Sequence, residues 1–418
     1  MYAKSLLSIL AACAAFISAA TCRPTPRAQD PTTDPFYQAP VGFDAQPPGT
    51  ILRQRQIAAA FLGFFPDPVN AYQLLYRTTA INGSAIAAVT TVFKPFNSMA
   101  DRFISFHTAY DSASVPCEPS YQYQLGVVPT DFMASMERFL FQQYLLKGYI
   151  VISPDHEGPD SALGAGRLAG MVVLDAMRAV SHFHDTLGFS TDRPAIVGIG
   201  YSGGAIATGW AASLHSSYAP ELNIKGWAQG GTPSNVTGTM LHVDNTVWSG
   251  LIPPALDGLL KPSAYGAQLQ PVIDSIITDQ GQIYLDFANR NCFIADLVNF
   301  RNKSILSTDL QSLGPAILQE PTIQRILADN ILGANKAETP VAPVLVYHGA
   351  DDATIPYEDA AAMVESWCNG GANVTFTTYV DHGHTSTVLL SQPEVGSFIE
   401  SAFAGTVPGG CSSGEWTG

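Results

Sequence analysis

The sequence predicts an α/β protein in which a mostly parallel central sheet is flanked by helices and carries an inserted helical cap. Short β-branched or aromatic segments, bounded by Gly, Pro or Asp, alternate along the chain with segments of helical periodicity. Such alternation favours parallel strands, because a helical crossover returns the chain to the same edge of the sheet. A third observation predicts the cap: residues 240–331 show helical patterns and no convincing strand.

The expected strands and helices are spread along the chain. The strands are expected at residues 86–93, 103–110, 149–153, 195–200, 224–228, 344–348 and 374–380, and the helices at 131–146, 168–187, 206–214 and 357–367. Strands joined in this way are covered by helices on both faces. We expect residues 51–239 and 332–418 to form this core.

The interval 240–331 interrupts the alternation and is expected to form a helical cap, or lid, over the core. Its helical patterns fall at 271–287 and 305–332, with Gly and Pro between helical pieces. The alternative is a set of extra helices packed on the edge of the sheet. Residues 21–50, rich in Pro, Thr, Asp and Gln, are expected to form an extended N-terminal lead-in.

The amino-terminal end predicts secretion. Lys4 precedes an apolar stretch, residues 6–20, that ends in small residues. We expect residues 1–20 to be a cleaved signal peptide; the alternative, a transmembrane anchor, needs about 20 apolar residues. The formal net charge of −15 argues against a nucleic-acid partner, because nucleic acids are bound through basic patches.

The cysteines also suit an oxidising compartment. They occur at positions 13, 22, 117, 292, 368 and 411, and Cys13 would leave with the signal peptide. We expect two disulfides among the last four, with Cys22 unpaired or removed by a second cut. The N-glycosylation acceptor tripeptides begin at Asn82, Asn235, Asn302 and Asn373.

A serine between glycines is the candidate nucleophile. The segment Gly-Tyr-Ser-Gly-Gly at residues 200–204 lies between an expected strand and an expected helix. In that context GxSxG forms a nucleophile elbow, because a strained turn projects the Ser202 hydroxyl and small neighbours let the substrate approach. The alternative is a glycine-rich turn, since the chain holds 36 glycines. The motif favours a serine hydrolase that works by acyl transfer.

A serine nucleophile needs a base, and the base needs an acid to orient it. In this kind of fold both follow the serine, the acid first and the histidine second. His382 and His384 follow the last expected strand, and Asp351 and Asp352 follow the strand before it. Spacing does not choose within either pair. The alternative is a pair of loop or metal-binding histidines, but no Cys or Glu cluster completes a metal site, so we expect no metal and no cofactor.

Acyl transfer also needs hydrogen-bond donors for the oxyanion. The first expected donor is the backbone N–H of Gly203, at the start of the helix after the serine. The second is expected in the loop after an earlier strand. No HGGG motif occurs upstream, and the strand at 103–110 runs into Asp111 and Ser112.

Several short stretches occur in a characteristic order along the chain. They are DPFY (34–37), LYRTT (75–79), CEPSY (117–121), DHEG (155–158), GYSGGA (200–205), YAPELNI (218–224), GGTP (230–233) and IPY (355–357). Over most of the mature chain this order resembles the fungal secretory lipase family, the Candida antarctica lipase A-like members of the α/β-hydrolase superfamily. The resemblance implies an α/β-hydrolase fold with a helical cap.

The resemblance also implies the choices that spacing leaves open. In that family the acid lies four residues before the Pro-Tyr pair, which implies Asp352, and the histidine implied is His384. The aspartate six residues before the first cysteine of the core helps to form the oxyanion hole, which implies Asp111 beside Gly203.

The same resemblance implies that Cys117 pairs with Cys292 and that Cys368 pairs with Cys411. The cluster Asp155-His156-Glu157 has the residue types of a catalytic or metal site. In the family this cluster does not supply the triad, so we expect a structural hydrogen-bond network there.

Together these features predict a secreted carboxylic ester hydrolase, a triacylglycerol lipase, that forms an acyl-enzyme on Ser202. The expected partners are a lipid or small ester substrate and, transiently, a lipid interface. Apolar residues of the expected cap, at 248, 251–252 and 259–260, favour an acyl tunnel, although packing between cap and core explains them equally well.

Other functions remain as alternatives. One is an esterase or deacylase that acts on soluble esters such as secondary metabolites. The lipase that typifies the family continues past its last cysteine into a segment over its substrate pocket, whereas this sequence stops soon after Cys411. Another is a binding module that has kept a hydrolase fold, although such modules usually lack a triad member. A peptidase is a third, but nothing here specifies a peptide pocket.

Overall fold

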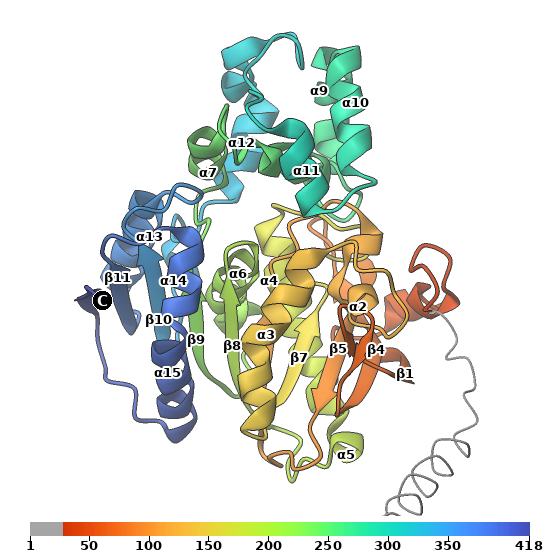
Figure 1. Cartoon of the computed structure of the whole chain (residues 1–418), viewed down its shortest axis with the longest axis vertical. Coiled ribbons are helices and arrows are strands. Elements are labelled where there is room, and N and C mark those ends of the chain that lie inside the picture. Colours follow the sequence, from red (N-terminus) through yellow and green to blue (C-terminus); the bar gives the residue numbers. More distant parts are fainter. Residues whose placement is uncertain (1–27) are drawn as a thin grey trace, which may run out of the picture.

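A ten-stranded, mostly parallel sheet runs through residues 28–418, the part of the chain that the computed structural model describes (Figure 1). Across the sheet the strands are β1 (Ile51–Ile57), β4 (Asn70–Thr79), β5 (Ala85–Lys94), β7 (Ile150–Pro154), β6 (Arg102–His107), β8 (Ala195–Tyr201), β9 (Ile224–Gly230), β10 (Val344–Gly349), β11 (Val374–Tyr379) and β12 (Ser412–Trp416). Neighbours are parallel from β7 to β12 and antiparallel from β1 to β7. The predicted α/β class is confirmed.

Two groups of helices cover the two faces of the sheet. On one face α3 (Phe132–Leu146) and α15 (Gln392–Ala404) pack on the strands, beside α14 (His384–Leu390). On the other face lie α4 (Gly166–His182), α6 (Gly203–Tyr218) and α13 (Tyr357–Asn369). Strand residues alternate between the two cores: Ile196 belongs to one and Val197 to the other, as the two-residue period of a strand requires.

The predicted helix at 168–187 is two helices. Helix α4 ends at His182 and α5 (His184–Leu187) follows it. Phe183, between them, packs its ring against Tyr72 of β4, with 5.7 Å between the ring centroids. The backbone of Phe183 leaves the helical conformation, with φ −88° and ψ 14°, and this ends α4.

Between β9 and β10 the chain is helical and has no strand over residues 231–343. The helices are α7 (Val236–Val243), α8 (Ile252–Leu259), α9 (Gly266–Ile276), α10 (Asp279–Ala288), α11 (Phe293–Phe300) and α12 (Pro321–Asp329), with 3-10 turns η4 (Ser249–Leu251), η5 (Gly314–Gln319) and η6 (Lys336–Glu338). Helices α7 and α9–α12 lie beyond the carboxyl ends of the parallel strands (Figure 1).

The bounds predicted for the two helical segments within this interval are wrong. The piece at 271–287 is split into α9 and α10, because the Thr278 side chain caps α10 by accepting a hydrogen bond from the Gly281 N–H. The piece at 305–332 consists of turns, η5 and α12. Gly314 has a positive φ of 56°, and Pro321 occupies the first position of α12.

The N-terminal lead-in is partly packed, which its composition did not predict. Within it lie two 3-10 turns, η1 (Pro35–Tyr37) and η2 (Phe43–Ala45). Phe36 is buried against Leu75 and Val89 of the sheet. The predicted signal peptide, residues 1–20, and Cys13 and Cys22 lie outside the described residues.

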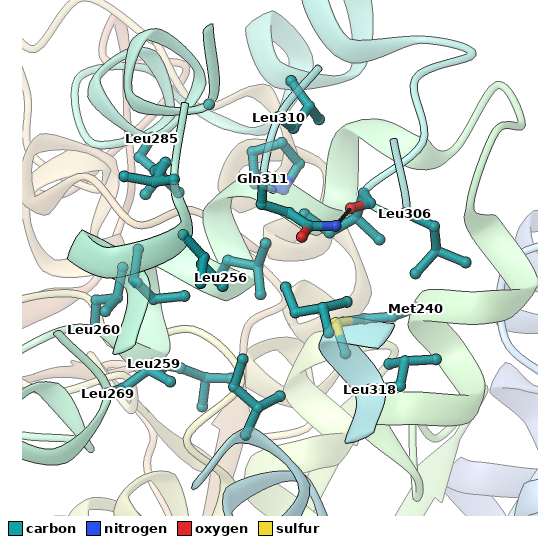
Figure 2. A pocket seen from close by; sticks show the side chains of 18 of the residues that line it. Met240, Leu256, Leu259, Leu260, Leu269, Leu285, Leu306, Leu310, Gln311 and Leu318 are labelled. Atoms are coloured by element: carbon teal, nitrogen blue, oxygen red, sulfur yellow. Dashed lines mark hydrogen bonds between the residues drawn. The ribbon is translucent and has the colours of Figure 1, made fainter. Parts of the chain in front are cut away.

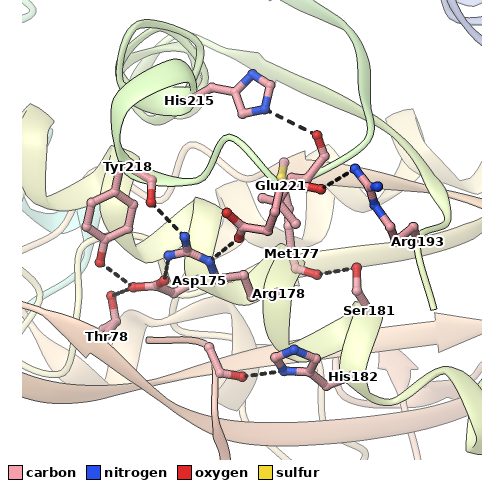
Figure 3. Close-up of polar contacts among 12 residues, drawn as sticks. Thr78, Asp175, Met177, Arg178, Ser181, His182, Arg193, His215, Tyr218 and Glu221 are labelled. Atoms are coloured by element: carbon pink, nitrogen blue, oxygen red, sulfur yellow. Dashed lines mark hydrogen bonds and ion pairs between the residues drawn. The ribbon is translucent and has the colours of Figure 1, made fainter. Parts of the chain in front are cut away.

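A polar network ties α4 to the carboxyl end of α6 and to β4 (Figure 3). Buried Asp175 accepts hydrogen bonds from the hydroxyls of Thr78 and Tyr218 at 2.7 Å each, and pairs with Arg178 at 2.8 Å. Arg178 in turn pairs with Glu221 at 2.6 Å. Two stretches of the family resemblance, 75–79 and 218–224, therefore meet in this network.

Two disulfides close long loops in the described chain. Cys117 pairs with Cys292, which joins the segment after β6 to the start of α11. Cys368 pairs with Cys411, which joins α13 to the approach to β12. No helix within residues 28–418 is long and apolar enough to cross a membrane.

Candidate active site

Ser202 lies in a strained turn between β8 and α6. Its φ of 54° is rare for a residue with a side chain. The turn needs small neighbours: a Cβ at Gly200 would collide with the backbone of Gly204, and one at Gly204 would collide with the carbonyl of His107. The glycines of the motif therefore let α6 approach β6 and β8 closely, and this turn holds the serine at the carboxyl end of β8.

His384, the first residue of α14, reaches the serine. Its Nε2 lies 2.9 Å from the Ser202 Oγ, and its Nδ1 lies 2.7 Å from the Asp352 Oδ2. A carboxylate can only accept, so the Nδ1–H donates to Asp352 and leaves Nε2 free to accept from the serine hydroxyl. The Tyr201 hydroxyl donates to the His384 carbonyl at 2.6 Å and fixes the start of α14.

Asp352 is buried in the turn after β10 and is held from both sides. Its Oδ1 accepts the backbone N–H groups of Thr354 and Ile355, each at 2.9 Å. Its Oδ2 accepts from His384 and also lies 3.3 Å from the His348 Nε2. Burial alone would raise the pKa of this carboxyl, but the hydrogen bonds from His348 and His384 hold its pKa well below the ordinary value of 3.8.

The competing residues lie elsewhere. The His382 ring packs against Trp416, with 5.2 Å between the ring centroids. Asp351 is exposed, and its backbone N–H donates to the His382 carbonyl at 3.0 Å. The structure thus brings together one member of each pair that spacing left open, and the two members are His384 and Asp352.

An apolar cavity opens at the serine. Asp111, Ser202 and Gly203 line it together with apolar side chains from the helical interval, among them Leu251 and Ile252. Gly203 begins α6, and the first N–H groups of a helix have no partner within the helix. Asp111 has a φ of 42°, another strained position. Its side chain lies against Gly203, where a Cβ would collide with it.

The loop that carries Asp111 is held by two other segments. Glu137 of α3 accepts the backbone N–H of Ala109 at 2.7 Å. The Ser112 hydroxyl accepts the backbone N–H of Phe293 at 3.0 Å, next to the disulfide between Cys117 and Cys292. The position of this loop beside the serine therefore depends on α3 and on the start of α11.

The cluster Asp155-His156-Glu157 supports the same loop from the end of β7. The His156 Nε2–H donates to the Thr108 carbonyl at 2.8 Å, and the Glu157 N–H donates to the Tyr110 hydroxyl at 3.1 Å. Asp155 accepts the backbone N–H of Ser120 at 2.8 Å. Burial lowers the pKa of His156 to about 4, so the ring is neutral at pH 7. Within residues 28–418 no group of three His, Cys, Asp or Glu side chains could hold a metal ion.

A second, larger apolar cavity lies within the helical interval (Figure 2). Its wall includes Leu256, Leu259 and Leu260 of α8 and its C-cap, and residues of α9, α10 and α12. Met240 of α7 lines both cavities. Of the cap residues that the sequence favoured for an acyl tunnel, Leu251 and Ile252 line the serine cavity and Leu259 and Leu260 line the second cavity. Trp248 packs into the core.

Sequence reasoning missed three residues that support the site. His348 contacts Asp352, the Tyr201 hydroxyl anchors His384, and Glu137 holds the loop of Asp111. A signal exists for Glu137, since helical periodicity places it on the buried face of α3 beside Ala134 and Phe141. The glycosylation predictions stay predictions; Asn82 and Asn302 are exposed, while the Asn235 side chain caps α7.

The Asp111 carboxyl predicts a pH dependence of stability. Burial raises its pKa from 3.8 to about 6, although nearby His384 opposes the shift. The folded protein thus holds this proton more tightly than the unfolded chain. Ionisation of Asp111 therefore lowers the free energy of unfolding. This loss grows as the pH rises from 3.8 to about 6 and stays constant above, at about 3 kcal/mol.

We therefore expect Asp111→Asn, which keeps the positive-φ backbone accessible, to lose less stability between pH 4 and pH 8 than the unchanged protein. Denaturant unfolding at both pH values measures this. Asp381→Asn is the matched control, because Asp381 also has a positive φ, 59°, but is exposed. Equal pH dependence in the Asp111 variant and the unchanged protein would show that ionisation of Asp111 costs the fold nothing.

A mostly parallel sheet, a serine in a strand–turn–helix elbow, and a histidine and an aspartate in hydrogen-bond reach of it define an α/β-hydrolase, here a carboxylic ester hydrolase. The chain belongs to the secretory lipase family, whose model matches residues 124–410. It is 38% identical over 382 residues to a secreted triacylglycerol lipase of Malassezia furfur, covering 90% of this chain and 77% of that protein. Like this relative, it is a secreted protein.

Solved structures agree with the family. Candida antarctica lipase A in its closed state superposes with a TM-score of 0.83 at 29% identity, over 91% of this chain and 88% of that one. A rice cell wall degrading esterase from Xanthomonas oryzae superposes with a TM-score of 0.64 at 16% identity, over 86% and 100% of the two chains. The second likeness shows the fold alone.

Proposed function

We propose that this enzyme is a triacylglycerol lipase that forms its acyl-enzyme on Ser202. Its relatives in Malassezia are named secreted triacylglycerol lipases. The observation that carries the proposal is the hydrogen-bonded series from Ser202 through His384 to Asp352, which opens onto an apolar cavity.

In the first half of the reaction the Ser202 Oγ attacks the ester carbonyl as His384 Nε2 takes its proton. Asp352 holds the ring in the tautomer that leaves Nε2 free, and it stabilises the imidazolium. The backbone N–H groups of Gly203 and Asp111 bind the oxyanion, and His384 then protonates the leaving alcohol. In the second half a water molecule, deprotonated by His384, releases the fatty acid and restores the serine.

The two cavities support a long acyl chain as the substrate group. We infer that residues 240–331 act as a cap over the core, and that the acyl chain extends from the serine cavity past Met240 into the larger cavity. Its wall consists almost wholly of Leu, Ile and other apolar side chains. Burial of each methylene in such a cavity contributes about 0.8 kcal/mol, so long chains are favoured over short ones.

Three substrates test the proposal: emulsified triolein, emulsified tributyrin, and p-nitrophenyl acetate in solution. We expect hydrolysis of both emulsified triacylglycerols, with triolein hydrolysed at least as fast as tributyrin. Ser202→Ala in the same emulsions is the control for non-enzymatic release. Hydrolysis of the soluble ester and tributyrin without hydrolysis of triolein would point instead to an esterase of short or soluble esters.

A further inference from the structure

Helix α3 carries apolar residues on the face that it turns to water. Phe132, Met136 and Phe139 are 49%, 41% and 59% exposed. They are spaced by four and three residues, so they form one stripe along the helix. Glu137 and Arg138, in contrast, are only 5% and 2% exposed. A surface helix normally exposes its charged residues, whereas α3 buries these two and exposes the three apolar ones.

The fold explains the buried charges but not the exposed stripe. Glu137 accepts the backbone N–H of Ala109, and Arg138 forms an ion pair with Asp67. Both charged side chains therefore have partners inside the protein. The exposed Phe and Met side chains gain little from the fold, because their contacts with water persist.

The hairpin formed by β2 (Ala60–Phe61) and β3 (Phe65–Pro66) extends the stripe. The Phe61 ring lies 4.4 Å, centroid to centroid, from that of Phe139. The Gly126 N–H donates to the Gly63 carbonyl at 2.8 Å, which joins the hairpin to the segment before α3. Phe64 and Phe65 at the hairpin are 62% and 63% exposed.

We call this continuous patch the α3 surface and define it by its six exposed apolar residues: Phe64, Phe65, Val128, Phe132, Met136 and Phe139. The segments that build it, residues 57–66 and 119–146, contain three charged residues, and all three are buried: Asp131, Glu137 and Arg138. The α3 surface is therefore uncharged on a protein whose formal net charge is −15.

The α3 surface also lies near the mouth of the site. Helix α3 leads into the start of β7, so its first residues lie at the carboxyl edge of the parallel strands, where Ser202 also lies (Figure 1). Glu137 of α3 accepts the backbone N–H of Ala109, two residues before Asp111, and Asp111 lines the serine cavity. A body that covers the α3 surface would thus stand beside the catalytic cavity.

We propose that the α3 surface is the face by which the enzyme docks on an uncharged lipid surface such as a triacylglycerol droplet; this rests on the proposed function. Contiguous exposed apolar patches mark sites of contact with a partner. An acidic protein is repelled by an anionic membrane, whereas a neutral oil surface carries no opposing charge. On docking, the apolar side chains of the α3 surface lose the contact with water that they keep in the folded protein alone.

The test uses the double variant Phe64→Ser with Phe65→Ser, at the exposed hairpin, and separately Phe132→Ser on the helix. Flotation with triolein droplets measures how much full-length protein binds. We expect each aromatic side chain lost to weaken binding about tenfold, hence about 100-fold for the double variant. Hydrolysis of p-nitrophenyl acetate in solution should stay within about twofold, because the variants leave the site intact. Phe96→Ser, at a residue 72% exposed outside the α3 surface, is the matched control and should bind as the unchanged protein does.

Unchanged flotation of the double variant would overturn the proposal, and so would a failure of the unchanged protein to float. A further outcome would also overturn the proposal: the enzyme is a dimer, the variants dissociate it into monomers, and the variants still float with the droplets. In that case the α3 surface would bind a second copy of the chain and not the droplet. Failure of the proposed function is distinguishable: droplets would then bind the unchanged protein, and the variants would bind weakly, while triolein stayed intact.

Discussion

Ser202→Ala is expected to lower kcat/KM for a p-nitrophenyl ester by about 10⁵- to 10⁶-fold. The hydroxyl is the only group of this residue that can attack a carbonyl, and its Oγ lies 2.9 Å from the base. An alanine fits the turn as well as a serine, so the fold should persist, with unchanged circular dichroism and a similar unfolding midpoint.

Ser213→Ala is the matched control for this variant. Ser213 belongs to the same helix, α6, is 1% exposed, and its Oγ has no hydrogen-bond partner. We expect full activity from it. A Ser202→Ala enzyme that kept more than a few per cent of its activity would mean that another group is the nucleophile.

Asp352→Asn is expected to lower kcat by about 10⁴-fold. Asparagine can keep one oxygen toward the N–H groups of Thr354 and Ile355, which then places its amide nitrogen, a donor, toward His384 Nδ1. The ring would have to take the other tautomer, in which Nε2 carries the proton and cannot accept one from Ser202. The rate of p-nitrophenyl ester hydrolysis at saturation measures the loss.

The neighbouring residue supplies the control. Asp351→Asn changes an exposed carboxylate one position away and should keep its activity within about twofold. Loss of activity in this variant, with retention in the Asp352 variant, would reverse the assignment of the acid. Stability gives a second readout: because the folded-state pKa of Asp352 is lowered, its ionised form stabilises the fold above pH 3.8, and this stabilisation is lost as the pH falls further.

The sequence was most informative where strands are buried on both faces. The expected strands at 195–200 and 344–348 match β8 and β10 within one residue at either end. Residues of these two strands are mostly apolar and buried. The expected strand at 374–380 also matches β11, although the threonines of β11 are only half-buried. The edges of the sheet were missed. Strand β1 places Arg and Gln among its apolar residues, and the Ser-Ser-Gly-Glu-Trp segment of β12 has low intrinsic strand propensity. Pairing with β11, next to the disulfide at Cys411, makes it a strand.

The candidate site was predictable in kind but not in full. Motif and order indicated the serine, histidine and aspartate, because each follows a recognisable strand. The choice between His382 and His384 depends on how α14 starts, which no local pattern encodes. His348 was unpredictable for a related reason: its contact with Asp352 arises from the turn between them, and only the folded turn brings the two side chains to 3.3 Å.

The central claim is that Ser202 is a nucleophile activated by His384 and Asp352. Labelling with a fluorophosphonate, followed by peptide mapping in a mass spectrometer, tests it most directly. We expect one phosphonyl group per protein, carried by Ser202, with ester hydrolysis lost in proportion, and no labelling of the His384→Ala variant on the same timescale. A label on another residue, or full labelling of the folded protein without loss of ester hydrolysis, would contradict the account.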